Sequence, residues 1–234
     1  MPDLSIRSLL PEVMDQEDAS GDETRLALTD IGFINKWLGG YAVILDALDK
    51  IQWPDRTLTI VDLGSGGGDT LRAISNWAKK KNKLVKLIGV DRNPVMTDFA
   101  VGLSKSFSNI EFVTMDVFDP RLADVKADIA MNSLFCHHFD NDDLVKLIQA
   151  MRNMASQAVI INDIDRHWFA YHSIKMLTSL FAKTDMVKYD APLSVARSLT
   201  KREWQEILQR AGAQNYSLRW MWAWRWQIII PKNA

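Results

Sequence analysis

The sequence has one cysteine, almost no net charge and no long apolar run. A single cysteine, Cys136, excludes an internal disulfide and fits a reducing compartment. The net charge of −1 gives no overall field that would attract nucleic acid or an anionic membrane surface. No uncharged apolar run approaches the ~20 residues of a membrane-spanning helix, and the opening MPDLSIRSLLPEVMD lacks the pattern of a signal peptide. We therefore expect a cytoplasmic protein with a small-molecule substrate, no nucleic-acid partner and no stable membrane insertion.

The composition is that of a globular protein with a substantial core, since 47% of the 234 residues are hydrophobic and 24% are charged. A chain of this length fits one α/β domain. We predict a single domain in four parts. These are a helical N-terminal cap (1–54), a central core (55–166), an insertion that forms a lid (167–195), and a C-terminal helix with a strand hairpin (196–234).

Short apolar runs alternate with helical patterns through the core. The predicted strands are 57–64, 86–91, 110–116, 127–132 and 158–163, followed by a hairpin at 215–222 and 224–230. Strands that alternate with helices indicate a parallel sheet covered on both faces. The last two strands have no helix between them, so one strand near the C-terminus should be antiparallel. The sequence thus predicts a doubly wound, seven-stranded α/β sheet.

A glycine-rich stretch, VDLGSGGGDT (61–70), follows the first predicted strand. Such a turn places backbone N–H groups and a helix N-terminus at the switch point of the sheet. The dinucleotide fingerprint G-x-G-x-x-G/A would use Gly64 and Gly66, but its third position holds Asp69. A carboxylate there would repel a pyrophosphate, so a nucleotide-dependent oxidoreductase is the disfavoured alternative.

The spacing that does fit is D-x-G-x-G-x-G, from Asp62 to Gly68. It resembles the first motif of class I S-adenosylmethionine (SAM) methyltransferases, which have a Rossmann-like fold. The resemblance implies SAM as cofactor. It assigns Asp62 to the cofactor's amino group or to the turn, Asp91 to the ribose hydroxyls and Asp116 to the adenine amino group. The other residues that it assigns to the cofactor are Gly64, Ser65, Gly66, Gly68, Arg92, Val117 and Asn132.

Three longer stretches sharpen the resemblance. They are similar to a bacterial stand-alone group related to the quinone-biosynthesis methyltransferases. The three stretches are NSLFCHHF (132–139), INDIDRHWFAY (161–171) and LSVARSLTKREW (193–204). That similarity implies a small-molecule acceptor.

Two histidines and an aspartate are candidates for catalysis. His137 and His138 follow the fourth predicted strand, and Asp163 ends the fifth. The expected strand order 3-2-1-4-5 makes these strands neighbours, so a His–Asp pair can form, in which the carboxylate fixes the tautomer of a general base. We favour His137, because His138 leads into the next helix. The alternative is that one histidine caps that helix and the other lies in the core. No metal site is predicted.

The substrate pocket is predicted from four residues. Arg166 and Arg197, the latter in an expected loop, could bind an acidic or quinone-like oxygen, or could instead pair with Asp165 or Asp190. Trp168 and Tyr171 begin the lid helix and could line an aromatic pocket, although an ordinary amphipathic helix is an equal alternative. The alternating tryptophans Trp220, Trp222, Trp224 and Trp226 fit core packing, or a surface for substrate or a homodimer.

Other methylation chemistries fit the sequence less well. Enzymes that methylate amino groups of bases and glutamines carry [ND]-P-P-[YF] after the fourth strand, where this chain has Asn132-Ser133-Leu134-Phe135. RNA methylation would need a basic face. We therefore expect O-methylation of a small, hydrophobic, aromatic hydroxyl compound such as a phenol, quinol or polyketide. C-methylation of a similar ring and a non-catalytic SAM-binding protein remain alternatives.

Overall fold

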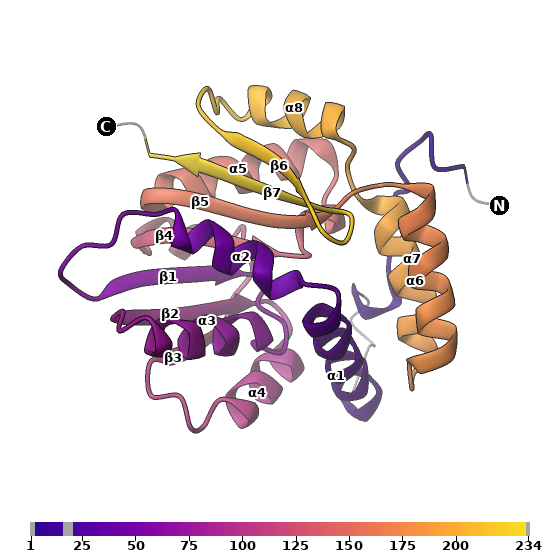
Figure 1. Cartoon of the computed structure of the whole chain (residues 1–234), viewed down its shortest axis with the longest axis horizontal. Helices are drawn as coiled ribbons and strands as arrows, with labels where there is room; N and C mark the ends of the chain where they lie inside the picture. The colour runs from indigo at the N-terminus through magenta and orange to yellow at the C-terminus, as the bar shows by residue number, and fades with distance from the viewer. Residues whose placement is uncertain (1–2, 16–20, 233–234) are drawn as a thin grey trace.

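The computed structural model describes residues 3–15 and 21–232. A seven-stranded sheet in the order β3-β2-β1-β4-β5-β7-β6 runs through the molecule (Figure 1). Only β7 is antiparallel to its neighbours, so the predicted mostly parallel sheet with one antiparallel strand is confirmed. The strands are β1 (Leu58–Leu63), β2 (Val85–Asp91), β3 (Ile110–Thr114), β4 (Ala127–Ser133), β5 (Ala155–Ile164), β6 (Ser217–Met221) and β7 (Arg225–Pro231).

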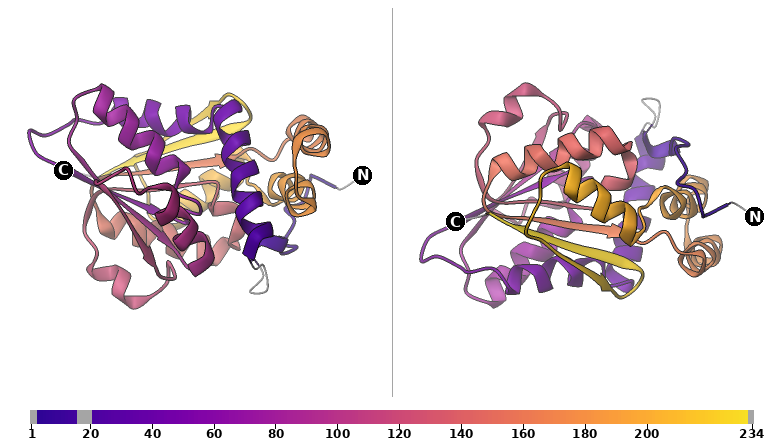
Figure 2. Two further views of the ribbon diagram at one scale, coloured as in Figure 1. Left: turned by 90° about the horizontal axis from the view of Figure 1, so that it is seen from below. Right: turned by 90° about the horizontal axis from the view of Figure 1, so that it is seen from above.

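Helices cover both faces of this sheet (Figure 2). The helices are α1 (Gly21–Trp37), α2 (Gly40–Asp49), α3 (Asp69–Lys80), α4 (Pro94–Leu103), α5 (Asn141–Met154), α6 (Trp168–Phe181), α7 (Asp185–Arg197) and α8 (Lys201–Arg210), with short 3-10 turns η1 (Val13–Asp15), η2 (Pro120–Asp124) and η3 (Cys136–His138). Residues 1–2 and 16–20 of the predicted cap, and 233–234, lie outside the described residues. None of the described helices is both long and apolar enough to cross a membrane.

Local sequence signals set several helix starts. Asn93 accepts a hydrogen bond from the Val95 amide and is followed by Pro94, which opens α4. Asp140 caps α5. Thr200 and Glu203 form the predicted capping box of α8.

The central strands are buried on both faces because two hydrophobic clusters sandwich them. Ile60 and its same-face neighbours pack against α2 and α3. Val61 and the opposite set pack against α5 and α8, where the indole of Trp204 is fully buried. Burial of both faces explains why these strands read as continuous apolar runs rather than as alternating patterns.

Helices α1, α6 and α7 gather at one end of the sheet, on the right in Figure 1. The structure corrects one local expectation there, because Arg197 ends α7 instead of lying in a loop. Thr184 caps this helix, and the buried side chains of Val187 and Val195 hold it in place. This packing keeps the chain helical despite Pro192, which on its own would favour a break.

At the amino-terminal end of the sheet, the Asp128 carboxylate joins three strands. It accepts two hydrogen bonds from the Arg56 guanidinium, at 2.8 and 2.5 Å, and one from the Thr59 amide at 2.9 Å. The Ser156 hydroxyl donates a fourth at 3.1 Å. The bonds from Arg56 and the others lower the pKa of Asp128 to about 2.

Asp128→Asn should lower the free energy of unfolding by about 1.5–3 kcal/mol at neutral pH, because the charge-assisted bonds are lost. The folded-state pKa of Asp128 lies below its ordinary value, so its contribution is present above about pH 4 and is lost as pH falls towards 2. Urea unfolding at pH 7 and at pH 3 measures both effects. Asp55→Asn, at an exposed position beside Arg56, is the control. Equal losses in both variants would contradict the assignment.

Candidate active site

A large cavity opens beyond the carboxyl ends of the parallel strands. The loops after β1, β2 and β4 border it, together with α1, α6, α7 and the β6–β7 turn. Its volume is about 1320 Å³. Pockets for a single small ligand measure roughly 300–1,000 Å³, so this cavity has room for a cofactor and a second molecule.

The glycine loop between β1 and α3 forms part of the cavity lining through Gly64, Ser65 and Gly66. Gly64 has φ +74°, and a Cβ atom there would lie 2.2 Å from the Phe135 ring, so this position requires glycine. Gly68 has a different role. It precedes α3 with φ +71°, packs against the ring of Phe112 and lies outside the lining.

Acidic side chains lie at the carboxyl end of β2 and just beyond β3. Asp91 ends β2, and its two oxygens accept hydrogen bonds from the Gly66 and Asn93 amides, both at 2.9 Å. Each carboxylate oxygen keeps a lone pair that a ligand hydroxyl could use. Asp116 lies two residues beyond β3, and beside it Val117 also lines the cavity. Arg92 borders the cavity as well and donates to the Asp15 carbonyl at 3.0 Å.

Two polar atoms beside the glycine loop have no hydrogen-bond partner among the described residues. They are Asp62 Oδ1 and Ser65 Oγ, and both are buried. Burial, with the nearby carboxylates of Asp69 and Asp91, raises the pKa of Asp62 well above its ordinary value. A cationic ligand group would relieve this cost. The amino-acid end of SAM carries an ammonium group, and the residues present therefore fit that cofactor.

Asn132 is placed differently from the other predicted cofactor residues. It lies in β4 and is fully buried, with its amide nitrogen 3.4 Å from Met151 Sδ and its oxygen 3.3 Å from Cys136 Sγ. Side chains alternate along a strand, so Asn132 is directed towards α5, and the next residue, Ser133, lines the cavity instead.

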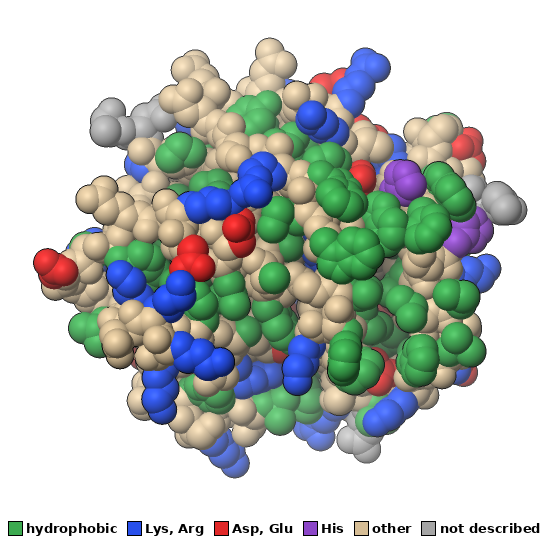
Figure 3. All heavy atoms as spheres, viewed as in Figure 1, with side chains coloured by type: hydrophobic (Ala, Val, Ile, Leu, Met, Phe, Trp, Pro, Cys, Tyr) green, Lys and Arg blue, Asp and Glu red, His purple; other side chains and the backbone are tan. Residues whose placement is uncertain are grey.

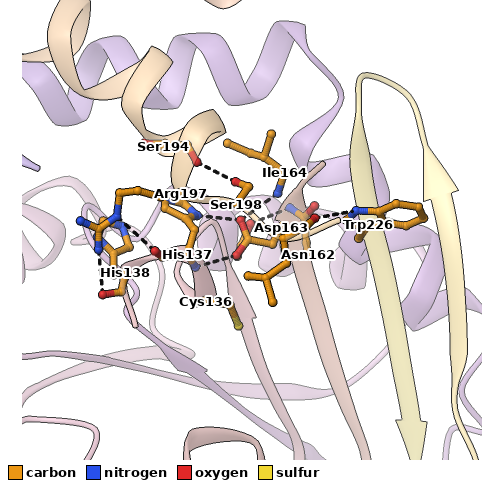
Figure 4. A network of polar contacts seen from close by, with 12 residues as sticks. Cys136, His137, His138, Asn162, Asp163, Ile164, Ser194, Arg197, Ser198 and Trp226 are labelled. Atoms are coloured by element: carbon orange, nitrogen blue, oxygen red, sulfur yellow. Dashed lines mark hydrogen bonds and ion pairs between the residues drawn. The ribbon is translucent and has the colours of Figure 1, made fainter. Parts of the chain in front are cut away.

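The structure brings His137 and Asp163 together (Figure 4). His137 Nδ1 lies 2.7 Å from Asp163 Oδ1, and the His137 amide donates to Oδ2 at 3.0 Å. Burial alone would raise the pKa of Asp163, but the His137 imidazole and the hydrogen bonds from His137 and Ile164 hold it below its ordinary value. An ionised Asp163 places the imidazole proton on Nδ1 and leaves a lone pair on Nε2.

His138 has a carboxylate partner of its own, and a second carboxylate lies between the two rings. His138 Nδ1 is 2.8 Å from Asp15 Oδ2. The Glu12 oxygens lie 3.7 Å from His137 Nε2 and 4.0 Å from His138 Nε2. Burial raises the pKa of Glu12 to about 7, against the opposing effect of His138. Sequence reasoning missed Glu12 and Asp15, because the only signal was two acids three residues apart in a segment without periodicity.

Both arginines that were predicted to bind the substrate form hydrogen bonds to other groups of the protein. Arg197 lines the cavity and donates to the His137 carbonyl at 3.1 Å and to the His138 carbonyl at 2.8 Å, so it holds the histidine turn. Arg166 lies outside the lining and pairs with Glu203 at 2.7 Å. Its acidic partner is therefore neither Asp165 nor Asp190, the two considered from the sequence.

The aromatic side chains that line the cavity are not the predicted Trp168 and Tyr171. Trp168 is 61% exposed, and neither it nor Tyr171 lines the cavity, whereas Phe169 does. Phe169 stacks on Trp224 of the β6–β7 turn, with ring centroids 4.9 Å apart. Of the four alternating tryptophans, Trp222 and Trp224 border the cavity and Trp226 is buried in the core. Figure 3 shows hydrophobic side chains gathered over this turn and α6.

Residues 60–157 match the family described as a methyltransferase domain. No curated protein sequence matches the chain. An O-methyltransferase family 2 protein from Planctomyces limnophilus, solved with apigenin, has a TM-score of 0.65 at 16% identity over 93% of this chain and 63% of its own.

Two further solved structures have the same fold. The plantazolicin methyltransferase BpumL, solved with SAH, has a TM-score of 0.62 at 16% identity over 91% of this chain and 96% of its own. The CurJ carbon methyltransferase gives 0.58 at 16% identity over 82% of this chain, which spans 52% of the CurJ structure. At these identities the likeness establishes the fold alone. The family match covers the glycine loop, most of β1, β2 to β4 and the first residues of β5, and it identifies this part of the chain as a class I SAM-dependent methyltransferase domain.

Proposed function

We propose that this methyltransferase methylates a hydroxyl group of a small, hydrophobic, aromatic compound of the phenol, quinol or polyketide type. The observation that carries the proposal is the buried His137–Asp163 pair at the cavity that the glycine loop also lines. Hydroxyl acceptors need a base, and a paired histidine is the usual one.

The chemistry divides between the cofactor and the side chains. SAM, when bound, supplies an electrophilic methyl group on its sulfonium. Asp163 keeps the proton of His137 on Nδ1, so Nε2 can accept the proton of the acceptor hydroxyl. The imidazolium that results is stabilised by the same carboxylate. Arg197 acts as a positioning residue, since it holds the carbonyls of His137 and His138.

The cavity walls support an aromatic acceptor. Phe169 and Trp224 present stacked rings, and apolar residues of α1, α6 and α7 complete the lining. Such walls bind a flat apolar ring and exclude water from the transfer. We propose 167–195, which holds α6 and most of α7, as the lid over this site. C-methylation is the second candidate, because the CurJ carbon methyltransferase shares the fold.

Asp91→Asn should weaken SAM binding by about tenfold to 150-fold, because hydrogen bonds to a charged group contribute about 1.5–3 kcal/mol. Isothermal titration calorimetry with SAM measures the dissociation constant. Asp98→Asn, at an exposed position on α4, removes an acid of the same charge and should bind like wild type. An unchanged dissociation constant in Asp91→Asn would contradict the cofactor site.

His137→Gln should lower kcat by about 10²–10⁴-fold without changing SAM affinity, because the base is lost and the cofactor site remains. The measurement is SAH formation with a panel of phenols and quinols. His172→Gln, on α6 and outside the cavity lining, is the matched control. Full turnover by His137→Gln would rule out the base, and no turnover of the panel by wild type would rule out the substrate class.

A further inference from the structure

A gap separates the Glu12 carboxylate from the two histidine rings. Oε1 lies 3.7 Å from His137 Nε2, and Oε2 lies 4.0 Å from His138 Nε2. Both distances exceed the range of about 2.7–3.2 Å for a hydrogen bond. The side chains of Glu12 and His137 are only 5% and 3% exposed. The two Nε2 atoms therefore face the Glu12 carboxylate without a direct hydrogen bond to it. The carboxylate has two other neighbours, since the Ser194 hydroxyl donates to Oε1 at 2.9 Å and the Arg197 Nε lies 3.7 Å from the same oxygen.

The size of this gap suits a metal ion. Bonds of about 2.1 Å to a tetrahedral ion would hold ligand atoms about 3.4 Å apart. The two measured separations, each to a different oxygen of Glu12, exceed that value by about 0.3 and 0.6 Å. One ligand atom from each of Glu12, His137 and His138 lies within 4.8 Å of the others, the one such group of histidine, cysteine or acidic residues among residues 3–15 and 21–232.

The far side of each ring gives an independent indication. His137 Nδ1 lies 2.7 Å from Asp163, and His138 Nδ1 lies 2.8 Å from Asp15. A carboxylate on Nδ1 fixes the proton there, leaves the Nε2 lone pair free and makes that nitrogen a better ligand. Both rings have this arrangement, and both face the same carboxylate. A single general base would need only one of them.

We propose that Glu12, His137 and His138 bind one divalent transition-metal ion at the cavity. Two imidazoles and one carboxylate favour ions such as Zn²⁺, Co²⁺ or Fe²⁺ over Mg²⁺ and Ca²⁺, which prefer oxygen ligands. Three protein ligands leave at least one coordination position for water or a ligand in the cavity.

One consequence rests on the proposed function. The lone pair of His137 Nε2 that would accept the hydroxyl proton is the one that binds the ion. Metal binding and proton acceptance at this atom therefore exclude each other, and bound metal switches the histidine base off. The metal site itself requires no assumption about the methyl acceptor.

The test measures metal binding by the full chain, without an affinity tag and without substrate. Chelator-treated protein is titrated with ZnCl₂ by calorimetry and with CoCl₂ by visible absorption. We expect one ion per chain, and a dissociation constant raised tenfold or more in Glu12→Gln and in His138→Gln. Asp15→Asn should raise it about 10–100-fold, because its carboxylate orients His138. His172→Gln should bind like wild type, and MgCl₂ should give no saturable signal.

The proposal is overturned if the wild-type chain binds no Zn²⁺, or if wild type, Glu12→Gln and Asp15→Asn bind it with equal affinity, which would mean that the ion binds elsewhere. Thermal unfolding of each variant shows whether it is folded, and Asp15→Asn decides the outcome if Glu12→Gln is not. The metal titration contains no methyl acceptor, so a negative result does not argue against His137 as the general base. In the same way, full turnover by His137→Gln would argue against the base and not against the metal site.

Discussion

The buried carboxylate of Asp163 is the contact on which the site depends. It is the last residue but one of β5 and accepts hydrogen bonds from the His137 amide, the His137 imidazole and the Ile164 amide, all within 3.0 Å. Its three hydrogen bonds tie the turn after β4 to the end of β5. His137 is thus fixed through its backbone as well as its ring, and Arg197 donates to the His137 carbonyl in the same turn.

Burial of acids gives the cavity its electrostatic character. The pKa of Asp62, of Asp91 and of Glu12 is raised, in each case chiefly by burial. Carboxyl groups held this way are stabilised by a cation. SAM brings two positive centres, its ammonium and its sulfonium, so acids whose burial raises their pKa would favour binding of this cofactor.

Much of the fold follows from local patterns, because apolar runs, caps and the glycine turn each depend on neighbouring residues. The His137–Asp163 pair was also predictable, since parallel topology makes β4 and β5 adjacent. The positions of Glu12 and Asp15 at the site could not be predicted, because these residues come from an N-terminal segment without hydrophobic periodicity. Asn132 was assigned to the cavity by family resemblance, but strand alternation turns its side chain towards α5. Phe169, and not the predicted Trp168, lines the cavity. The side of α6 that faces the cavity is set by packing against other parts of the chain, which the local pattern does not give.

The N-terminal segment packs against α7 and the histidine turn. Arg7 donates to the carbonyls of Phe139 and Arg197, and the Val13 and Met14 amides donate to Asp190. These contacts join residues that are 132 to 190 positions apart in the sequence. The Gly66–Asp91 contact of the glycine loop spans only 25 positions. The glycine end of the cavity is therefore held by contacts of short sequence separation, whereas its histidine end depends on two distant parts of the chain.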